Sequence, residues 1–297
     1  MQYSISDLEQ LSGVHAHTIR MWEQRYNALV PHRSAGNTRY YDDEHLVKLL
    51  NIVSIHQKGL KISKICALSQ DAIHHLIEED IQETVSKNQQ FEFYITQLLN
   101  FGMSYNEAAF DNLLSKCIND NTLTETYSSV IYPMLVRLGL MWRKDSICAA
   151  QEHFLTNIIR QKICAAINDL PVPSSDKKTW VLFLPQDEEH EIGVLFANYL
   201  LRQAGKRVIY LGSRVPLSSV KEVVKLNKVD SLMLFMVQAK LTNEAQKYID
   251  EISVAFKKTK IYLAGSQKLI ENIQLPKGIQ WLRGINEFEV LVNDFSC

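Results

Sequence analysis

The spacing of apolar residues changes twice along the chain and predicts three regions. Residues 1 to about 75 carry short helical patterns around one stretch rich in glycine, arginine and tyrosine, residues 32–41. From about 76 to 170 the apolar residues recur at helical spacing and no strand pattern occurs. We therefore expect a small amino-terminal domain over 1–75, a four-helix bundle over 76–172 and a third domain over 178–297.

Strand patterns begin only after the Pro- and Ser-containing linker 169–178. Four short apolar runs, WVLFLP, RVIYLG, SLMLFMV and KIYLAG, are each followed by a helical stretch. Strands that alternate with helices form parallel sheets covered on both faces. Such units, repeated over about 120 residues, predict a flavodoxin-like (Rossmann-type) α/β domain, which binds ligands at the carboxyl ends of its strands.

Composition narrows the class of protein. The chain has 297 residues, 46% of them hydrophobic and 22% charged, which excludes a disordered or fibrous chain. No apolar run approaches the roughly 18 residues of a membrane span, and the start lacks a signal peptide, so we expect a cytoplasmic protein without a membrane partner. The five cysteines form no CxxC pair and imply neither a zinc site nor disulfides.

The amino-terminal helices predict a helix-turn-helix motif. Ser6 is expected to cap a short first helix, Gly13 breaks the chain, and residues 15–26 form a second helix, which enters the DNA major groove in such motifs. Ile19 and Trp22 recur at helical spacing and are expected to pack inward. The side chains expected to face DNA are His17, Thr18 and Arg20.

A basic hairpin is predicted next, over residues 31–41, where Gly36-Asn37 favours a tight turn. Between residues 13 and 64 eight Lys and Arg residues accompany four acids, although the whole chain has a net charge of -1. This local excess favours a nucleic-acid surface over an ordinary solvated face. The wing residues expected to contact phosphates are Arg33, Arg39, Tyr40 and Tyr41.

The order of these features resembles the MerR family of transcription regulators. The resemblance rests on the helix-turn-helix with TIRMWEQRY, a Pro-Arg wing that ends in RYY, and the acid-rich DDEHLVKLL, and it covers roughly the first 70 residues. It implies that a dimer binds a pseudo-palindromic element of double-stranded promoter DNA. No sustained heptad pattern follows this region, so the dimer contact is unassigned.

The loop after the first predicted strand offers a metal ligand. It contains Glu188-x-His190-x-x-Gly193 at the sheet edge where ligands bind. His190 can offer a neutral imidazole, while Glu188 can accept the other ring N–H and fix the tautomer. Gly193 lets a bulky planar ligand approach the backbone. The alternative is an ordinary surface histidine.

A second pattern lies in the helical region, where nine residues separate Trp142 from Glu152-His153. Across two antiparallel helices these three side chains are expected to project toward one spot. The alternative is a core tryptophan with an unrelated surface pair. Gly212, before Val215-Pro216, matches the turn after the second strand of cobalamin-binding domains.

Together, the bundle and these two motifs resemble the light-sensing cobalamin repressors of the CarH and LitR type, over nearly the whole chain. The resemblance implies that adenosylcobalamin binds with His190 as the lower cobalt ligand, and that light breaks the cobalt–carbon bond so that a homo-oligomer, a dimer or a tetramer, releases DNA. It implies cofactor contacts from Trp142, Glu152, His153, Glu188, Gly193, Gly212 and Gly265.

Three positions depart from that pattern. Arg143 stands where such receptors have a second histidine that can ligate cobalt after illumination. Phe235-Met236-Val237 replaces a Ser-x-Leu element that makes room for the nucleotide tail, and Ala264-Gly265 replaces a Gly-Gly pair. These departures argue for altered photochemistry or weak cobalamin binding.

Two other function classes compete with a cobalamin-dependent regulator. One is a regulator of the same build whose degenerate sensor domain needs no cobalamin and oligomerises or binds a protein antagonist. The other is a corrinoid methyl-transfer enzyme, which also pairs a helical cap with an α/β domain but has no use for a winged helix. The sequence contains no P-loop, nucleophile elbow or HxxxH pair, so we expect a regulator rather than an enzyme.

Overall fold

The computed structural model describes residues 2–34, 36–57, 59–69, 72–73, 76, 87–142, 147–174, 177–237 and 242–294. The chain divides into two compact units, Met1–Ile158 and Ile159–Cys297. The domain boundary expected near residue 75 lies next to residues 77–86, which are outside the described part of the chain. The regions before and after this expected boundary both belong to the first unit. No helix in the described ranges has both the length and the apolar character needed to cross a membrane.

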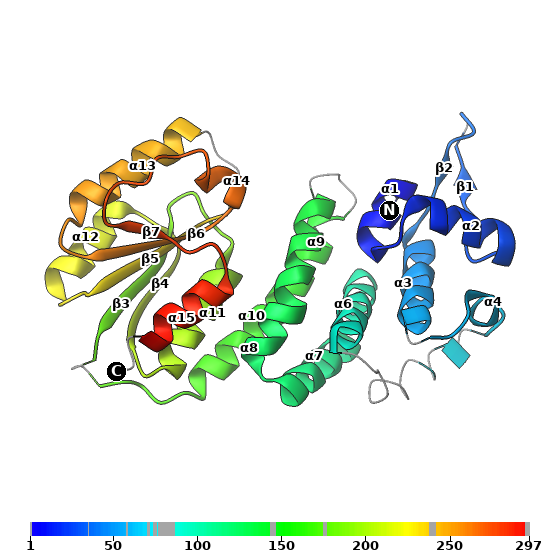
Figure 1. Ribbon diagram of the computed structural model, residues 1–297, viewed down its shortest axis with the longest axis horizontal. Helices are drawn as coiled ribbons and strands as arrows, with labels where there is room; N and C mark the ends of the chain where they lie inside the picture. The colour runs from blue at the N-terminus through cyan, green and yellow to red at the C-terminus, as the bar shows by residue number, and fades with distance from the viewer. Residues whose placement is uncertain are drawn as a thin grey trace. The chain divides into compact units, whose positions relative to one another are not determined.

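The described residues of the first unit form helices, connecting loops and one two-stranded hairpin. Its amino-terminal elements are α1 (Ile5–Ser12), α2 (Ala16–Tyr26), β1 (His32–Arg33), β2 (Arg39–Tyr40), α3 (Asp43–Gln57) and α4 (Ile62–Ile65). They are followed by α6 (Lys87–Met103), α7 (Glu107–Asn121), α8 (Leu123–Thr126), the π-helical turn η1 (Tyr127–Ile131), α9 (Tyr132–Trp142) and α10 (Ala149–Asn168). Figure 1 shows these elements along the chain.

A capping box determines where α1 begins. The hydroxyl of Ser4 accepts from the N–H of Asp7 at 3.2 Å, and the Asp7 carboxylate accepts from the N–H of Ser4 at 2.7 Å. The prediction that Ser6 caps this helix is wrong, because this reciprocal pair begins the helix two residues earlier. Gly13 ends α1 with φ 72°, and the predicted turn between the two helices is confirmed.

Buried side chains join the amino-terminal elements to the helices that follow. Helix α3 packs along α6, and within this contact the side-chain amide of Asn100 donates to that of Asn51 at 2.6 Å. Leu98 and Leu114, which the sequence places on apolar helix faces, are fully buried. The hairpin region and the helical region therefore share one packed body.

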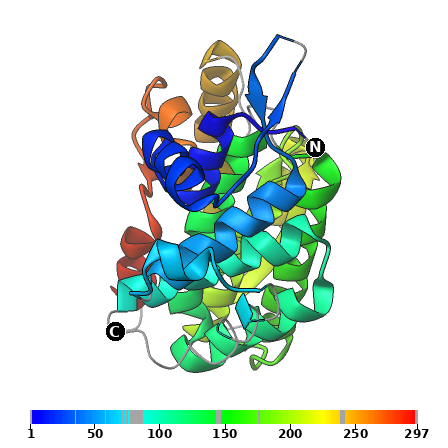
Figure 2. The ribbon, with the colours of Figure 1, turned by 90° about the vertical axis from the view of Figure 1, so that its right-hand side faces the viewer.

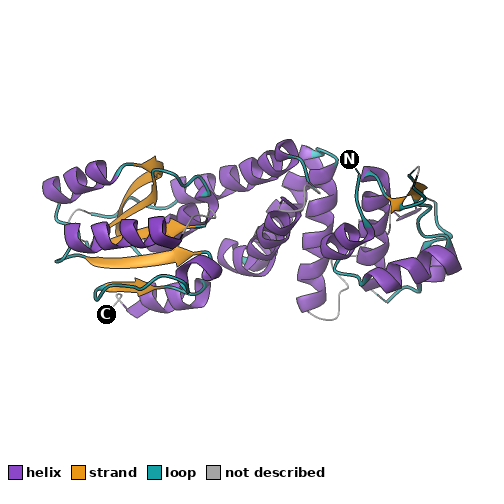
Figure 3. Cartoon of the chain, turned by 90° about the horizontal axis from the view of Figure 1, so that it is seen from above, coloured by secondary structure: helices purple, strands orange, loops and turns teal. Residues whose placement is uncertain are grey.

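The second unit is an open α/β sheet with the predicted topology. All five strands are parallel in the order β4-β3-β5-β6-β7, the flavodoxin-like order. Helices α11 and α15 cover one face and α12 and α13 the other (Figure 1), and Figure 3 shows helices on both sides of the strands. The elements are β3 (Thr179–Pro185), α11 (Glu191–Gln203), β4 (Arg207–Val215), α12 (Leu217–Leu226), β5 (Ser231–Met236), α13 (Thr242–Ala255), β6 (Lys260–Gly265), α14 (Gln267–Ile270), β7 (Ile279–Trp281) and α15 (Ile285–Asp294).

The central strand β3 lies between β4 and β5, and all seven of its residues are buried. Full burial follows from the double cover of helices, which leaves no polar face to the strand. The loop that contains Glu188 and His190 leaves β3 at its carboxyl end, the edge where sheets of this type bind ligands.

Candidate functional site

The loop after β3 turns sharply into α11. The N–H of Glu188 donates to the carbonyl of Pro185 at 2.9 Å, and His190 stands at the N-cap position of α11. The side chain of Glu188 is fully buried, whereas that of His190 is 56% exposed. The loop thus buries the carboxylate and presents the imidazole to solvent.

Among the described residues, four N–H groups lie within hydrogen-bond distance of the buried Glu188 carboxylate. Its Oε1 accepts from the backbone N–H groups of Glu189 at 3.1 Å and His190 at 3.2 Å, and it lies 2.5 Å from Nδ1 of His190. Its Oε2 accepts from the backbone N–H of Val237, which directly follows β5, at 2.7 Å. These bonds compensate the cost of burying a carboxylate.

This arrangement selects one tautomer of the imidazole. Because an ionised carboxylate only accepts hydrogen bonds, Nδ1 of His190 carries the proton and the neutral ring has its lone pair on Nε2. The hydrogen bond expected between Glu188 and His190 is present. The backbone N–H of Arg214, in β4, donates to the carbonyl of Glu188 at 3.2 Å, so both neighbouring strands hold the loop. Histidine metal ligands are commonly oriented by such a carboxylate.

The three glycines assigned to cofactor binding lie in different surroundings. A Cβ atom at Gly193, in the first turn of α11, would lie 3.0 Å from Cε1 of Phe235, so that aromatic ring occupies the space beside the glycine. Gly212 has φ 79° next to an irregularity in the pairing of β4 with β3. Gly265 has φ 133°, and a Cβ there would overlap the backbone of Met236. At position 265 the close approach of the Met236 backbone therefore requires a glycine. The atoms nearest to Gly193, in contrast, belong to the side chain of Phe235.

The residues assigned to the upper face of a cofactor belong to the first unit. Trp142 ends α9, and its side chain lies outside the described part of the chain, as does Arg143. Glu152 lies in the first turn of α10, and its carboxylate is 3.1 Å from Nδ1 of His153, whose side chain is 71% exposed. These two side chains contact each other, and the His153 ring is accessible to solvent.

The helix-turn-helix buries one face of α2 and exposes the other. Ile19 and Trp22 are buried, as the sequence predicts. His17 and Arg20 are exposed and Thr18 is partly exposed, so all three are accessible to DNA. The amino-terminal half of the second helix contacts base edges in motifs of this type.

The wing is the β1–β2 hairpin, which projects from the surrounding helices in Figure 2. At its tip Nη1 of Arg33 donates to the side-chain oxygen of Asn37 at 2.7 Å, and Asn37 adopts φ 59°. Arg33 is exposed, while Arg39 and Tyr40 are partly exposed. These three side chains are accessible for the predicted phosphate contacts.

Tyr41 departs from its predicted role. Its side chain is fully buried, and its hydroxyl donates to Oε1 of Glu23 at 2.6 Å. Burial and this hydrogen bond raise the pKa of Tyr41 above its usual range. The expected phosphate contact from Tyr41 is wrong, because the ring belongs to the core, where the N–H of Tyr3 donates to the carbonyl of Tyr41 at 2.7 Å.

Sequence reasoning missed Glu23 as a positioning residue for the wing. Its Oε2 lies 4.0 Å from Nε of Arg39, while Oε1 binds the hydroxyl of Tyr41. The available signal was an acidic side chain on a helix whose other charged residues are Arg20 and Arg25.

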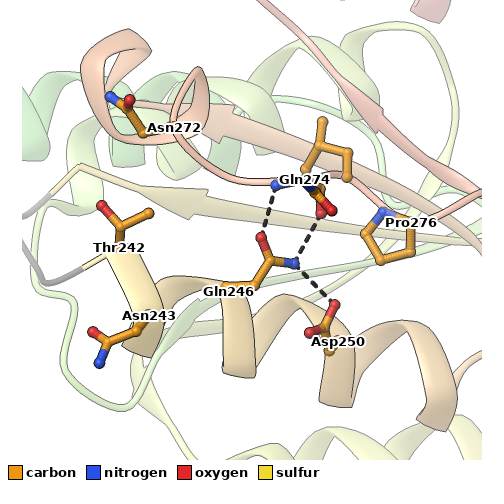
Figure 4. A pocket seen from close by; sticks show the side chains of 8 residues that line it. Thr242, Asn243, Gln246, Asp250, Asn272, Gln274 and Pro276 are labelled. Atoms are coloured by element: carbon orange, nitrogen blue, oxygen red, sulfur yellow. Dashed lines mark hydrogen bonds between the residues drawn. The ribbon is translucent and has the colours of Figure 1, made fainter.

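A separate surface hollow of about 720 Å³ lies against α13 (Figure 4). There Gln246 accepts from the N–H of Gln274 at 2.7 Å and donates to its carbonyl and to Asp250, both at 2.9 Å. The hydrogen bonds of Gln246 thereby link α13 to the segment after α14. The hollow is lined by Thr242, Asn243, Gln246, Asp250, Asn272, Gln274, Leu275 and Pro276, and none of these belongs to the loop of Glu188 and His190.

Two regions of the chain match known protein families. Residues 3–71 match the MerR HTH family regulatory protein, and residues 94–166, within α6–α10, match the B12 binding domain. The HTH-type transcriptional repressor CarH of Myxococcus xanthus is 25% identical over 255 residues, which is 85% of each chain. The HTH-type transcriptional repressor CarA of the same organism is 25% identical over 257 residues, 84% of this chain and 82% of CarA.

Among solved structures, the monomethylamine corrinoid protein of Methanosarcina barkeri aligns with a TM-score of 0.55. It shares 14% identity and covers 68% of this chain and 97% of its own, a likeness that concerns the fold alone. The chain therefore combines a MerR helix-turn-helix region and a B12-binding region with a Rossmann-like sheet, and it is a homologue of the CarH and CarA repressors.

Proposed function

We propose that this protein is a DNA-binding transcription regulator that senses cobalamin through a cobalt–His190 bond. The observation that carries the proposal is the 2.5 Å contact between the buried Glu188 carboxylate and Nδ1 of His190, which places the lone pair of the neutral ring on Nε2 of a side chain that is 56% exposed. Imidazole nitrogen is a suitable axial donor for cobalt. The B12-binding match and the named repressor relatives support the same function.

In the second unit, the orientation of the imidazole donor suits this cofactor, whereas the space available for the cofactor beside Gly193 is restricted. The His190 ring is already oriented, so ligation needs no change of tautomer. The Phe235 ring lies beside Gly193, and it has to turn aside before a planar ring system can reach the backbone there. Gly212 and Gly265 are the other residues of this unit that we assign to the cofactor.

We assign Trp142, Glu152 and His153 to the adenosyl side of the cofactor, on the resemblance to CarH-type receptors. The exposed His153 and the partly exposed Glu152 offer polar atoms for such a group. Light sensitivity would come from the cobalt–carbon bond of adenosylcobalamin, which is the chemistry that the cofactor supplies. A change in the helical region would reach the DNA-binding elements through the packing of α3 on α6.

On the DNA side, we assign base contacts to His17, Thr18 and Arg20 and phosphate contacts to the wing. The partner is double-stranded promoter DNA, bound by a homo-oligomer that is a dimer or a tetramer. The match to the MerR HTH family and the repressor relatives support this assignment.

The test is retention of the cofactor by the purified full chain. After mixing with adenosylcobalamin in the dark and gel filtration, the wild type should keep the visible absorption of the cofactor, and His190→Ala should lose it. Glu189→Gln is the matched control, since this neighbouring side chain is 63% exposed and pairs only with Arg214 among the ion pairs of the described chain. Green light should change the spectrum of the wild type and release promoter DNA in a mobility-shift assay.

One observation favours a second candidate, a regulator of the same build that needs no cobalamin. The ring of Phe235 fills the space beside Gly193. Such a regulator would oligomerise or bind a protein antagonist through its sheet domain. If the wild type elutes without cofactor yet still binds promoter DNA, this second function replaces the first.

A further inference from the structure

Two imidazoles and one carboxylate converge at the base of the wing. His32 begins β1, Asp42 directly precedes α3, and His45 lies in the first turn of that helix. Nε2 of His32 is 2.7 Å from Oδ2 of Asp42, and Nδ1 of His45 is 2.5 Å from Oδ1. One nitrogen or oxygen atom from each of the three residues lies within 4.8 Å of the others.

The second nitrogen of His45 bears on which ring atom faces Asp42. Nε2 of His45 lies 2.7 Å from the carbonyl oxygen of Val30. A carbonyl oxygen only accepts, so Nε2 carries a proton, and in a neutral ring Nδ1 then has its lone pair directed at the Asp42 carboxylate. Two acceptors 2.5 Å apart repel each other unless a positive particle lies between them. At 2.5 Å only a proton fits between the two atoms, and a metal ion would take its place once they lie about 3.3 Å apart.

We propose that His32, Asp42 and His45 bind a divalent transition-metal ion, with zinc as the representative. Two imidazole nitrogens favour zinc, cobalt, nickel or copper over magnesium and calcium, which prefer oxygen ligands. The N–H···O=C bond from His45 to Val30 is the usual support of a metal-bound histidine. Three protein ligands leave one tetrahedral position for water.

The present geometry needs only small adjustments to accept such an ion. Tetrahedral zinc with bonds of about 2.0–2.1 Å places its ligand atoms about 3.3 Å apart. The three donor atoms already lie within 4.8 Å, and the His32 and His45 rings meet edge to face with centroids 5.0 Å apart. The side chain of His32 is 47% exposed, so it can move onto the ion without disturbing the core.

The consequence concerns the wing. A metal bound here would tie β1 to the first turn of α3, and it would add positive charge next to Arg33, which we assign to DNA phosphates. The wing would then hold one orientation relative to α3. This site uses none of the residues assigned to cobalamin.

The experiment measures bound zinc per chain. Tag-free full-length protein, stripped with a chelator and kept free of cobalamin, is dialysed against Zn²⁺ and analysed for metal. His32→Gln should bind one zinc fewer than the wild type, and Asp42→Asn, which keeps an oxygen to cap α3, should bind it at least about tenfold more weakly. The matched control is His15→Gln, because His15 also pairs with a carboxylate, Glu9 at 2.9 Å, but is in no group of three metal-binding side chains among the described residues.

Two further readouts decide the assignment. Zinc should raise the melting temperature of the wild type and of His15→Gln but not that of His32→Gln. Cobalt(II) in place of zinc should give visible d–d bands without a thiolate charge-transfer band. Equal zinc content in wild type and His32→Gln, or a thiolate band lost on cysteine substitution, would overturn the proposal.

Discussion

Replacing Glu188 by glutamine removes one of the two acceptor oxygens on a fully buried side chain. The carboxylate serves three donors through Oε1 and the backbone N–H of Val237 through Oε2. A glutamine amide can keep its oxygen toward the three donors, but its NH₂ group then faces the N–H of Val237. Hydrogen bonds to charged groups contribute about 1.5–3 kcal/mol each, and the three remaining bonds weaken because the acceptor is neutral. We expect Glu188→Gln to lower the free energy of unfolding of the second unit by about 2–4 kcal/mol.

The same substitution should weaken cobalamin binding by about 10- to 100-fold, because the His190 ring loses its charged partner. Urea unfolding followed by circular dichroism measures the stability, and titration followed by visible absorption measures the affinity. Glu189→Gln removes the same charge one residue away at a 63% exposed position, and surface ion pairs contribute about 0–1 kcal/mol. The reasoning fails if the two variants are equally stable, whatever their affinity for cobalamin.

Three other changes test separate parts of the structure. Phe235→Ser should raise cobalamin affinity about fivefold by clearing the space beside Gly193, since displacing a half-buried ring costs about 1 kcal/mol. Isothermal titration measures the affinity, and equal values for the variant and the wild type would contradict the prediction. Arg33→Ala should weaken binding to specific and unrelated duplexes alike and reduce the salt slope by about one, as read from titrations at several salt concentrations. Burial raises the pKa of Cys117 to about 11, whereas a hydrogen bond from Tyr105 lowers that of Cys148. Iodoacetamide near neutral pH should therefore label Cys148 before Cys117, as mass spectrometry can show.

The sheet topology could be predicted from the sequence because it depends on local alternation. Apolar runs separated by helical stretches leave few ways to build a parallel sheet, and the order β4-β3-β5-β6-β7 is one of them. The start of α1 was predicted less well. Both Ser4 and Ser6 are good capping residues, and only the reciprocal bond with Asp7 distinguishes them.

In the candidate site, too, contacts between residues close in sequence could be predicted, whereas contacts between distant residues could not. The pairing of Glu188 with His190 joins residues two apart, so their spacing predicts it. The N–H of Val237 is 49 residues away from Glu188, and no pattern near either residue indicates the bond. Tyr41 was misplaced for a related reason, because its partner Glu23 is 18 residues earlier, and a tyrosine in a basic hairpin suits a DNA contact equally well.

Two neighbouring residues at the end of β5 affect a bound ligand in separate ways, one through the space available to it and the other through the orientation of its donor. Phe235 controls the space beside Gly193 through its side chain, whereas Val237 holds Glu188, and through it His190, by its backbone N–H. A phenylalanine ring can change rotamer without moving the backbone two residues later, so the space can open while the imidazole keeps its orientation. Substitution at Phe235 therefore reports on ligand access and substitution at Glu188 on ligand orientation. The donors to Glu188 do not include the Phe235 side chain, so the arrangement that orients the imidazole does not depend on where that ring lies.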